Sequence, residues 1–294
     1  MLLTTLFIAA CALPPRVERA QPESSDRITI LVDAFGGSAE LHQDWGYSAL
    51  VEYGGKRVLF DTGNNNEGFA RNVRALGMDL SRLDAVVILH RHGDHTDGLR
   101  YLLTVNPHVR IYVPDDEYFG GNTPPVFFRQ TSPGLPREMR YFNGAIPDVV
   151  PHGSAWRANF VRVDSTVEIA PGLTLVRNIA AGRQFGETPE LSLVVQTPTG
   201  PVVMVGCSHP GIERILASVT SAVNPHIRLV VGGMHLVTTL DAEVARVISA
   251  LQKEWGVKAV APGHCTGERA FAQMRRAFGA DYVYAGVGTS IPIT

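Results

Sequence analysis

Short apolar runs, some alternating with polar residues, recur along most of this chain, which is the pattern of β-strands wholly or half buried in a core. Other stretches repeat apolar residues at helical spacing and predict helices. The expected strands cover residues 28–32, 47–53, 57–60, 83–89, 109–113, 161–163, 167–169, 173–177, 191–196, 202–205, 227–231 and 259–261. The expected helices cover residues 67–76, 96–105, 211–221, 241–255 and 267–278.

The order of these elements predicts an α/β fold. A strand-rich opening is followed by a strand-rich middle and then by an end in which helices and strands alternate. We therefore expect two sheets packed together with helices outside them, in one four-layer domain over residues 27–294. Gly54-Gly55 predicts a tight hairpin, Gly77 the end of the first helix, and Thr96 the N-cap of the second.

Residues 114–160 interrupt this regular pattern with a stretch rich in proline and aromatic residues. An irregular stretch of this length inside a domain is usually a lid or a binding loop. Its aromatic side chains either line a substrate pocket or pin the loop to the core, and the sequence does not separate the two.

The first 26 residues differ from the rest. Residues 1–12 are almost wholly apolar and residues 13–25 are rich in proline and charge, as in an export leader followed by a tether. Ile8-Ala9-Ala10-Cys11 resembles a lipobox, although the first basic residue is Arg16. We expect a protein of the bacterial cell envelope, either periplasmic or held to the membrane by a lipid on Cys11. The alternatives are a misplaced start codon or a short buried segment, and then a cytoplasmic protein.

Composition narrows the function classes. Hydrophobic residues make up 45% of the chain and charged residues 18%, as in an ordinary globular protein. The formal net charge of -2 gives no reason to expect a nucleic-acid partner, so we expect a small-molecule substrate. Three cysteines, at 11, 207 and 265, are too few for a disulfide framework.

The stretch that follows the strand at 83–89 carries the strongest chemical signal. His90, His92, Asp94 and His95 are all potential metal ligands. Residues two apart leave an extended segment on the same side, so His90 and His92 can bind one ion while Asp94 and His95 turn toward a second. Strand ends rarely gather so many titratable groups without a use for them.

Three later strands end in the same way, each running into small residues and then a histidine. These histidines are His209, His235 and His264. Glycine beside them lets the backbone approach an ion or a substrate closely. One composite metal site explains all four segments together.

The segment His90-Arg91-His92-Gly93-Asp94-His95 resembles the HxHxDH signature of the metallo-β-lactamase superfamily, and Leu59–Gly63 resembles its preceding strand and turn. The later Gly-Cys-Ser-His-Pro-Gly, Gly-Gly-Met-His-Leu and His-Cys-Thr-Gly segments resemble one branch, the 7,8-dihydropterin-6-methyl-4-(β-D-ribofuranosyl)aminobenzene 5'-phosphate synthase-like proteins. This resemblance implies an αβ/βα sandwich of two mixed β-sheets with a two-metal site in the crevice between them.

The resemblance also implies a ligand set. His90, His92 and His209 would bind the first metal, and Asp94, His95 and His264 the second. Many superfamily members have an aspartate where this chain has Cys207, which either binds or bridges the ions or only lines the site. An alternative alignment places Glu187 at a metal-binding position. The ions would be two divalent cations, zinc or else manganese or iron, and a Cys207 ligand would favour zinc.

Three further residues are expected around these ligands. Asp61 either hydrogen-bonds a ligand histidine or a metal-bound water, or forms an ordinary turn with the two residues after it. Asp97 is expected to orient a histidine. His235 is expected to contact substrate or an anion, since other residues already fill the two sites.

The leading hypothesis for function is metal-dependent hydrolysis of an ester, amide or phosphoester bond by an activated water. Asp94 would orient that water or accept its proton. One alternative is a pterin-related synthase that uses metal as a Lewis acid, and a cytoplasmic substrate of that kind fits poorly with an export leader. Another is a metal- or ligand-binding envelope protein without turnover, which would need every metal position filled by protein ligands.

Overall fold

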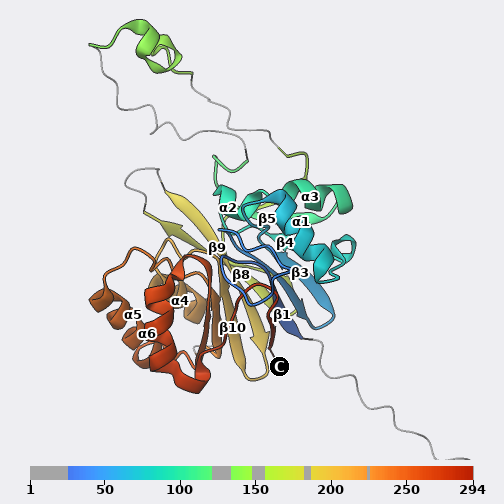
Figure 1. Cartoon of the computed structure of the whole chain (residues 1–294), viewed down its shortest axis with the longest axis vertical. Coiled ribbons are helices and arrows are strands. Elements are labelled where there is room, and N and C mark those ends of the chain that lie inside the picture. The colour runs from blue at the N-terminus through green and yellow to red at the C-terminus, as the bar shows by residue number, and fades with distance from the viewer. Residues whose placement is uncertain (1–25, 121–133, 148–155, 182–186, 224–225, 294) are drawn as a thin grey trace, which may run out of the picture.

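In the computed structural model, two β-sheets pack face to face (Figure 1). The structure describes residues 26–120, 134–147, 156–181, 187–223 and 226–293. Within these residues the first sheet has the strand order β13 (Ser290–Pro292), β1 (Arg27–Val32), β2 (Ser48–Tyr53), β3 (Lys56–Phe60), β4 (Ala85–Val87), β5 (Arg110–Pro114), β6 (Asn159–Val163). The second has the order β12 (Ala259–Pro262), β11 (Leu229–Gly232), β10 (Gly200–Val205), β9 (Thr188–Thr197), β8 (Leu173–Ala180), β7 (Val167–Ala170).

Both sheets are mixed, as expected. In the first sheet, β13, β1, β2 and β3 pair antiparallel, whereas β3 to β6 pair parallel. In the second, β10, β11 and β12 are parallel, and β7 to β10 pair antiparallel. The β2–β3 hairpin turns through Gly54 and Gly55, whose φ angles of 57° and 77° are those of a turn that favours glycine.

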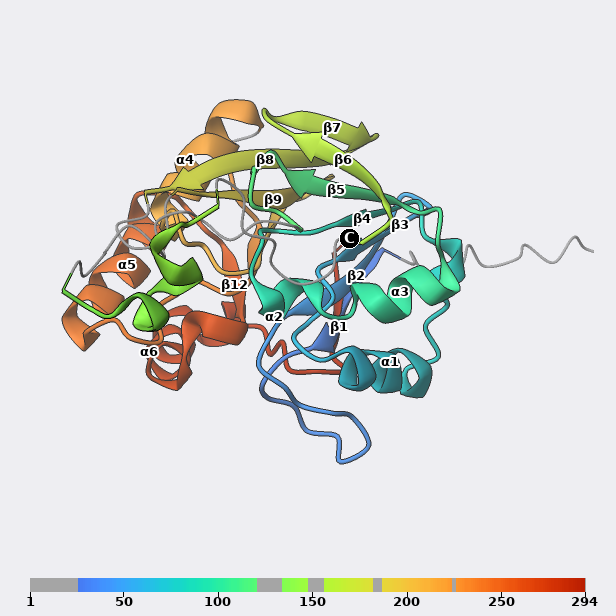
Figure 2. The ribbon, with the colours of Figure 1, turned by 90° about the horizontal axis from the view of Figure 1, so that it is seen from above.

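Helices cover the outer face of each sheet. Figure 2 shows α1 (Asn66–Ala75) and α3 (Leu99–Val105) on one side of the sandwich, and α4 (Ile212–Ala222), α5 (Asp241–Lys253) and α6 (Glu268–Phe278) on the other. Successive side chains of a strand point to opposite faces of the sheet, so each sheet packs against the other sheet on one face and against helices on the other. In β10, Val202 and Met204 face the other sheet, while Val203 faces the helices. The predicted four-layer α/β sandwich is confirmed.

The predicted elements differ from the structure in a few places. The expected helix at 96–105 is two helices, α2 (Gly93–Thr96) and α3. Thr96 therefore ends α2, and its hydroxyl donates to the carbonyl of His92, so the prediction that it caps a helix start is wrong. The strand predicted at 83–89 is only Ala85–Val87, and β13 was not predicted because three residues carry too short a pattern.

The expected insertion at 114–160 is described only in part. Residues 134–147 contain two 3₁₀ helices, η3 (Arg137–Met139) and η4 (Tyr141–Gly144), and the side chains of Tyr141 and Phe142 are exposed. Phe119 and Trp156, in contrast, belong to the apolar cluster under the first sheet's helices. These two aromatic residues thus pin the segment to the core, which is the second of the two roles expected for its aromatic side chains.

The expected leader at 1–26 lies outside the described residues except for Asp26. Among the helices of the described residues, none is long and apolar enough to cross a membrane.

Candidate metal centre

The carboxyl ends of parallel strands from both sheets meet at one edge of the sandwich. Asp61 follows β3 and His90 follows β4, while Cys207, His235 and His264 follow β10, β11 and β12. Residues from five separate strand ends thus come together, which is the usual position of ligand sites in open α/β sheets.

His90, His92 and His209 form the first group. Their ring nitrogens lie within 4.8 Å of one another, and their ring centroids are 4.3 to 5.0 Å apart. Burial lowers the pKa of His90 well below its usual value, and burial followed by the charge of His209 lowers that of His92 to about 4. Both rings are therefore neutral at pH 7, as metal binding requires.

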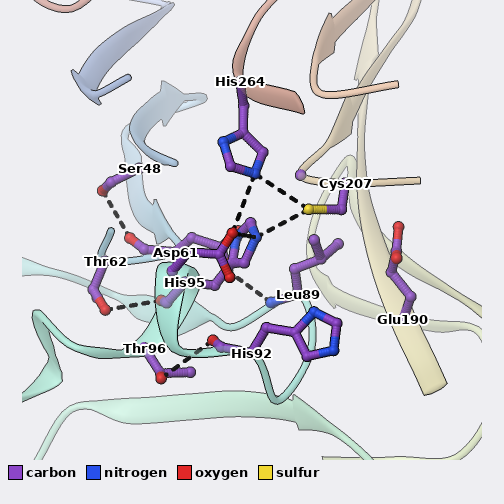
Figure 3. A network of polar contacts seen from close by, with 12 residues as sticks. Ser48, Asp61, Thr62, Leu89, His92, His95, Thr96, Glu190, Cys207 and His264 are labelled. Atoms are coloured by element: carbon purple, nitrogen blue, oxygen red, sulfur yellow. Dashed lines mark hydrogen bonds and ion pairs between the residues drawn. The ribbon is translucent and has the colours of Figure 1, made fainter. Parts of the chain in front are cut away.

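Asp94, His95, Cys207 and His264 form the second group. Cys207 Sγ lies 3.1 Å from His95 Nε2 and 3.3 Å from His264 Nε2, and Asp94 Oδ2 lies 3.6 and 3.5 Å from the same two nitrogens. A tetrahedral zinc ion with N, O and S ligands would hold neighbouring ligand atoms about 3.3–3.6 Å apart. Figure 3 shows the Cys207 sulfur between the two rings.

Asp61 fixes the ring of His95. Asp61 Oδ2 lies 2.7 Å from His95 Nδ1, and Oδ1 accepts the backbone N–H of Leu89 at 2.8 Å (Figure 3). Burial alone would lower the pKa of His95, but the neighbouring Asp61 raises it to about 9. Asp61 holds one proton on Nδ1, so His95 directs Nε2 toward the second group, and the proton on Nε2 would leave when a cation binds.

Glu190 fixes His209 in the same way and was missed by the sequence analysis. This glutamate is 1% exposed within β9, accepts the backbone N–H groups of Ser208 and His209 at 2.7 and 3.0 Å, and lies 2.9 Å from His209 Nδ1. The sequence offered one signal for this role, a charged residue inside an otherwise apolar strand, because a glutamate is rarely buried without a partner.

Asp33, also missed, supports the second group from the end of β1. Its carboxylate accepts the backbone N–H of His264 at 2.9 Å, and burial raises its pKa to about 8. His264 has a φ of 47°, and Asp61, Ser208 and His235 also have φ between 51° and 63°. Non-glycine residues adopt this conformation at a cost, and such residues gather at functional sites.

Cys207, His235 and Cys265 form a third group, with donor atoms within 4.8 Å of one another. Hydrogen bonding with Cys207, and then with His235, lowers the pKa of Cys265 to about 4, while the pKa of Cys207 rises. The proton that remains on Cys207 would leave when a cation binds, because thiols bind metal as thiolates.

The glycines of the strand ends allow these approaches. A Cβ added to Gly206 would lie 2.3 Å from Leu89 Cδ2 and 2.9 Å from Asp61 Oδ2. One added to Gly233 would lie 2.0 Å from the carbonyl oxygen of Gly206 and 2.8 Å from Cys265 Sγ. Any larger residue would push the three strand ends apart.

The polar atoms of His90 test whether metal fits these groups. His90 is fully buried, and neither of its ring nitrogens has a hydrogen-bond partner among the described residues. A buried polar group left without a partner costs about 1–3 kcal/mol. Neutral imidazole nitrogens facing two other imidazoles are the donors that zinc and similar ions prefer, so the residues present fit a divalent metal.

Comparisons with known proteins agree with this geometry. The family model described as the metallo-beta-lactamase superfamily matches residues 46–178. Tm1679, whose structure is titled a metal-dependent hydrolase of the beta-lactamase superfamily, is 28% identical with a TM-score of 0.69, covering 92% of this chain and 99% of that one. The chain carries a metallo-β-lactamase superfamily domain.

Two other relatives differ in their named activities. The 7,8-dihydropterin-6-methyl-4-(beta-D-ribofuranosyl)-aminobenzene-5'-phosphate synthase of Methanocaldococcus jannaschii is 26% identical over 284 residues, covering 86% of this chain and 92% of the relative. The short form of human tRNase Z matches with a TM-score of 0.53 at 15% identity, over 91% of this chain and 99% of that one, and shares the fold alone. Superfamily members typically bind divalent metals.

Two residues expected beside the ligands of this metallo-β-lactamase domain lie elsewhere. The Asp97 carboxylate accepts the backbone N–H of Asn66 at 3.0 Å and faces Arg100. It therefore supports the start of α1, and among the described residues it makes no hydrogen bond or ion pair with a histidine. Glu187 is exposed and belongs to none of the three groups, and its carbonyl oxygen accepts from Arg91. Both expectations rested on the places of these residues in the family resemblance, and a place in a sequence does not determine the direction in which a side chain points.

Arg91, between the two histidines of the first group, turns away from them. Its guanidinium pairs with Asp116 at 2.6 Å, and both side chains are buried. It also donates to Thr188 Oγ1 at 3.2 Å and lies over the ring of Tyr118. Arg91 thus ties the metallo-β-lactamase motif to the start of β9 and to the segment after β5.

Two exposed side chains flank the metal-ligand groups. The Trp45 ring lies 5.0 Å from the His264 ring and the residue is 45% exposed. The His235 ring lies 4.6 Å from the His209 ring, and His235 is also exposed. A contact role was expected for His235 from its place after a strand, whereas Trp45 was not expected because its loop carries no motif.

Proposed function

We propose that this protein is a metal-dependent hydrolase that acts on an ester, amide or phosphoester bond of a small molecule. The observation that carries the proposal is the adjacency of the first and second groups. The His90 and His95 rings are 4.4 Å apart, so the two sets of donors are neighbours. The two groups would hold two neighbouring divalent ions, which is a common arrangement in hydrolytic enzymes.

The first group leaves room for chemistry. Three histidines supply three ligands, and zinc sites with three protein ligands keep a position for water or substrate. His92 and His209 are partly exposed, so that position is open toward solvent. This favours an enzyme over a non-catalytic binding protein, whose metal positions would all be filled by the chain.

The second group would hold its ion by Asp94, His95, Cys207 and His264. Bound ions would generate a nucleophile from water at neutral pH and polarise a carbonyl or phosphoryl oxygen. Burial opposes ionisation of Asp94, yet His264 and His95 hold its pKa below the usual value. As a partly exposed carboxylate, Asp94 would orient the water and accept its proton. The Cys207 thiolate favours zinc over manganese.

Trp45 and His235 would contact the substrate, because each is exposed and each lies against a ligand histidine. Trp45 offers an apolar face and His235 a hydrogen-bonding group. The formal net charge of -2 favours a small molecule over nucleic acid.

The named activities of the relatives support two candidates. The resemblance to Tm1679 over 92% of this chain favours hydrolysis. The resemblance to the archaeal synthase over 86% of the chain favours the second candidate, a synthase-type reaction on a pterin-like substrate. We prefer hydrolysis because a leader at residues 1–26 would carry the protein away from cytoplasmic intermediates.

The experiment compares wild type, His92→Ala and His108→Ala on phosphodiester, phosphomonoester, ester and amide substrates, with a pterin substrate beside them. We expect wild type and His108→Ala, which changes an exposed histidine, to hydrolyse one substrate class and His92→Ala to lose that turnover. Turnover of the pterin alone would favour the synthase, and equal hydrolysis by His92→Ala would contradict the proposal.

A further inference from the structure

The third group uses two residues that the other groups do not. Cys265 follows β12 and His235 follows β11, and with Cys207 after β10 they place two sulfur atoms and an imidazole nitrogen within 4.8 Å of one another. These strands are parallel neighbours in the order β10, β11, β12, so their carboxyl ends open at the same edge. The cluster is therefore built by the sheet itself.

Packing does not account for this arrangement. Cys207 and Cys265 are 3% and 2% exposed. The Sγ atom of Cys265 lies 3.5 Å from the carbonyl oxygen of Cys207 and 4.0 Å from that of Gly206, and it also hydrogen-bonds with the side chains of Cys207 and His235. His235 adopts a φ of 51°, a left-handed conformation that residues with a side chain rarely adopt. Its ring nitrogen lies within 4.8 Å of both sulfur atoms.

Cys207 faces two groups at once. Its sulfur lies 3.1 and 3.3 Å from the Nε2 atoms of His95 and His264, and within 4.8 Å of the donor atoms of His235 and Cys265 in the third group. A thiolate has lone pairs enough to contact two cations, and two-metal sites hold their ions about 3.5–4 Å apart. The Cys207 sulfur is thus placed to bind one cation in the second group and another in the third group at the same time.

We propose that Cys207, His235 and Cys265 form a third cation site, selective for a thiophilic divalent ion such as zinc or cadmium, with Cys207 bridging it to the second group. Two thiolates and an imidazole are the donor set that soft ions prefer, whereas manganese and magnesium prefer oxygen. His235 is exposed, so a fourth ligand can come from solvent. The site rests on the thiol geometry and does not require hydrolysis.

The test counts cadmium ions bound to the full chain in a Cys11→Ser background, which removes the one other thiol. Equilibrium dialysis gives the equivalents bound, and thiolate-to-metal charge-transfer absorption reports sulfur ligation. We compare the parent with Cys265→Ser, which keeps a donor toward the Cys207 carbonyl, with His235→Gln at an exposed position, and with His108→Ala as a surface-histidine control.

We expect three equivalents in the parent and in His108→Ala, and two in Cys265→Ser and His235→Gln, with weaker charge-transfer absorption in Cys265→Ser. A parent that binds no more than two equivalents would overturn the proposal, as would three equivalents in both Cys265→Ser and His235→Gln. His235→Gln keeps the test valid if the buried serine impairs folding. Absence of hydrolysis with three ions bound would count against the proposed function alone.

Discussion

Asp61 Oδ2 lies 2.7 Å from His95 Nδ1, and both side chains are completely buried. Because a carboxylate only accepts hydrogen bonds, this contact keeps a proton on Nδ1 and directs Nε2 toward Cys207 and Asp94. The second donor group therefore depends on a residue that follows a different strand, β3, and that would not itself touch the ion.

Asp61→Asn is the sharpest test of that dependence. Asparagine has nearly the same shape and tolerates the φ of 57° at this position, so the fold should persist. We expect affinity for the second ion to fall about 10- to 100-fold, the usual effect of losing such a partner. Titration against a competing chelator measures it, with Asp84→Asn, an exposed carboxylate on another face, as the control. Unchanged affinity would contradict the role given to Asp61.

Glu190→Gln tests the matching support of His209. Glutamine retains one acceptor oxygen where the carboxylate has two, so one of the backbone donors at Ser208 or His209 loses its partner. We expect the metal-free protein to lose about 1–3 kcal/mol in free energy of unfolding, measured in urea. Affinity for the first ion should fall as well, and loss of stability alone would show that Glu190 is only structural.

The histidines of the first group predict a pH dependence of the metal-free protein. Burial lowers the pKa of His92 to about 4 in the folded state, below its usual 6.5. The unfolded chain therefore binds a proton first, so stability is present above about pH 6.5 and is lost as pH falls toward 4. Calorimetry of wild type and His92→Gln between pH 7 and 5 should show a steeper fall in Tm for wild type. Parallel curves would be inconsistent with this shift.

Trp45→Ala should weaken substrate binding and leave the chemistry intact. An aromatic contact contributes about 1 kcal/mol, which corresponds to a roughly fivefold rise in KM with little change in kcat. Steady-state kinetics on the best substrate of the panel measures the split. Tyr284→Ala removes another exposed aromatic residue, which packs on Phe35, and should change neither constant. A fall in kcat alone would argue against substrate contact.

The architecture could be predicted from the sequence because successive residues of a strand point to opposite faces of its sheet, and both faces are buried here. Val202, Val203 and Met204 alternate between the inter-sheet core and the helix-covered core, as the four-layer fold requires. The hairpin at Gly54-Gly55 and the helix end at Gly77 were also predictable, because all three residues adopt a positive φ, which glycine adopts without steric cost.

The site was harder to predict because its supporting contacts join residues far apart in sequence. Glu190 and His209 meet only because β9 and β10 pair antiparallel, and Asp33 meets His264 across the whole chain. Cys265 was overlooked beside the more familiar His264, although both follow the same strand. Asp97 and Glu187 show the opposite error, since a place in a motif does not fix which way a side chain points.

The most direct test of the central claim is metal content measured together with turnover. Purified protein should contain at least two equivalents of a divalent ion, lose hydrolysis when a chelator removes them, and recover it when zinc, or else manganese or iron, is returned. Full hydrolytic activity in protein shown by elemental analysis to be free of metal would contradict the account.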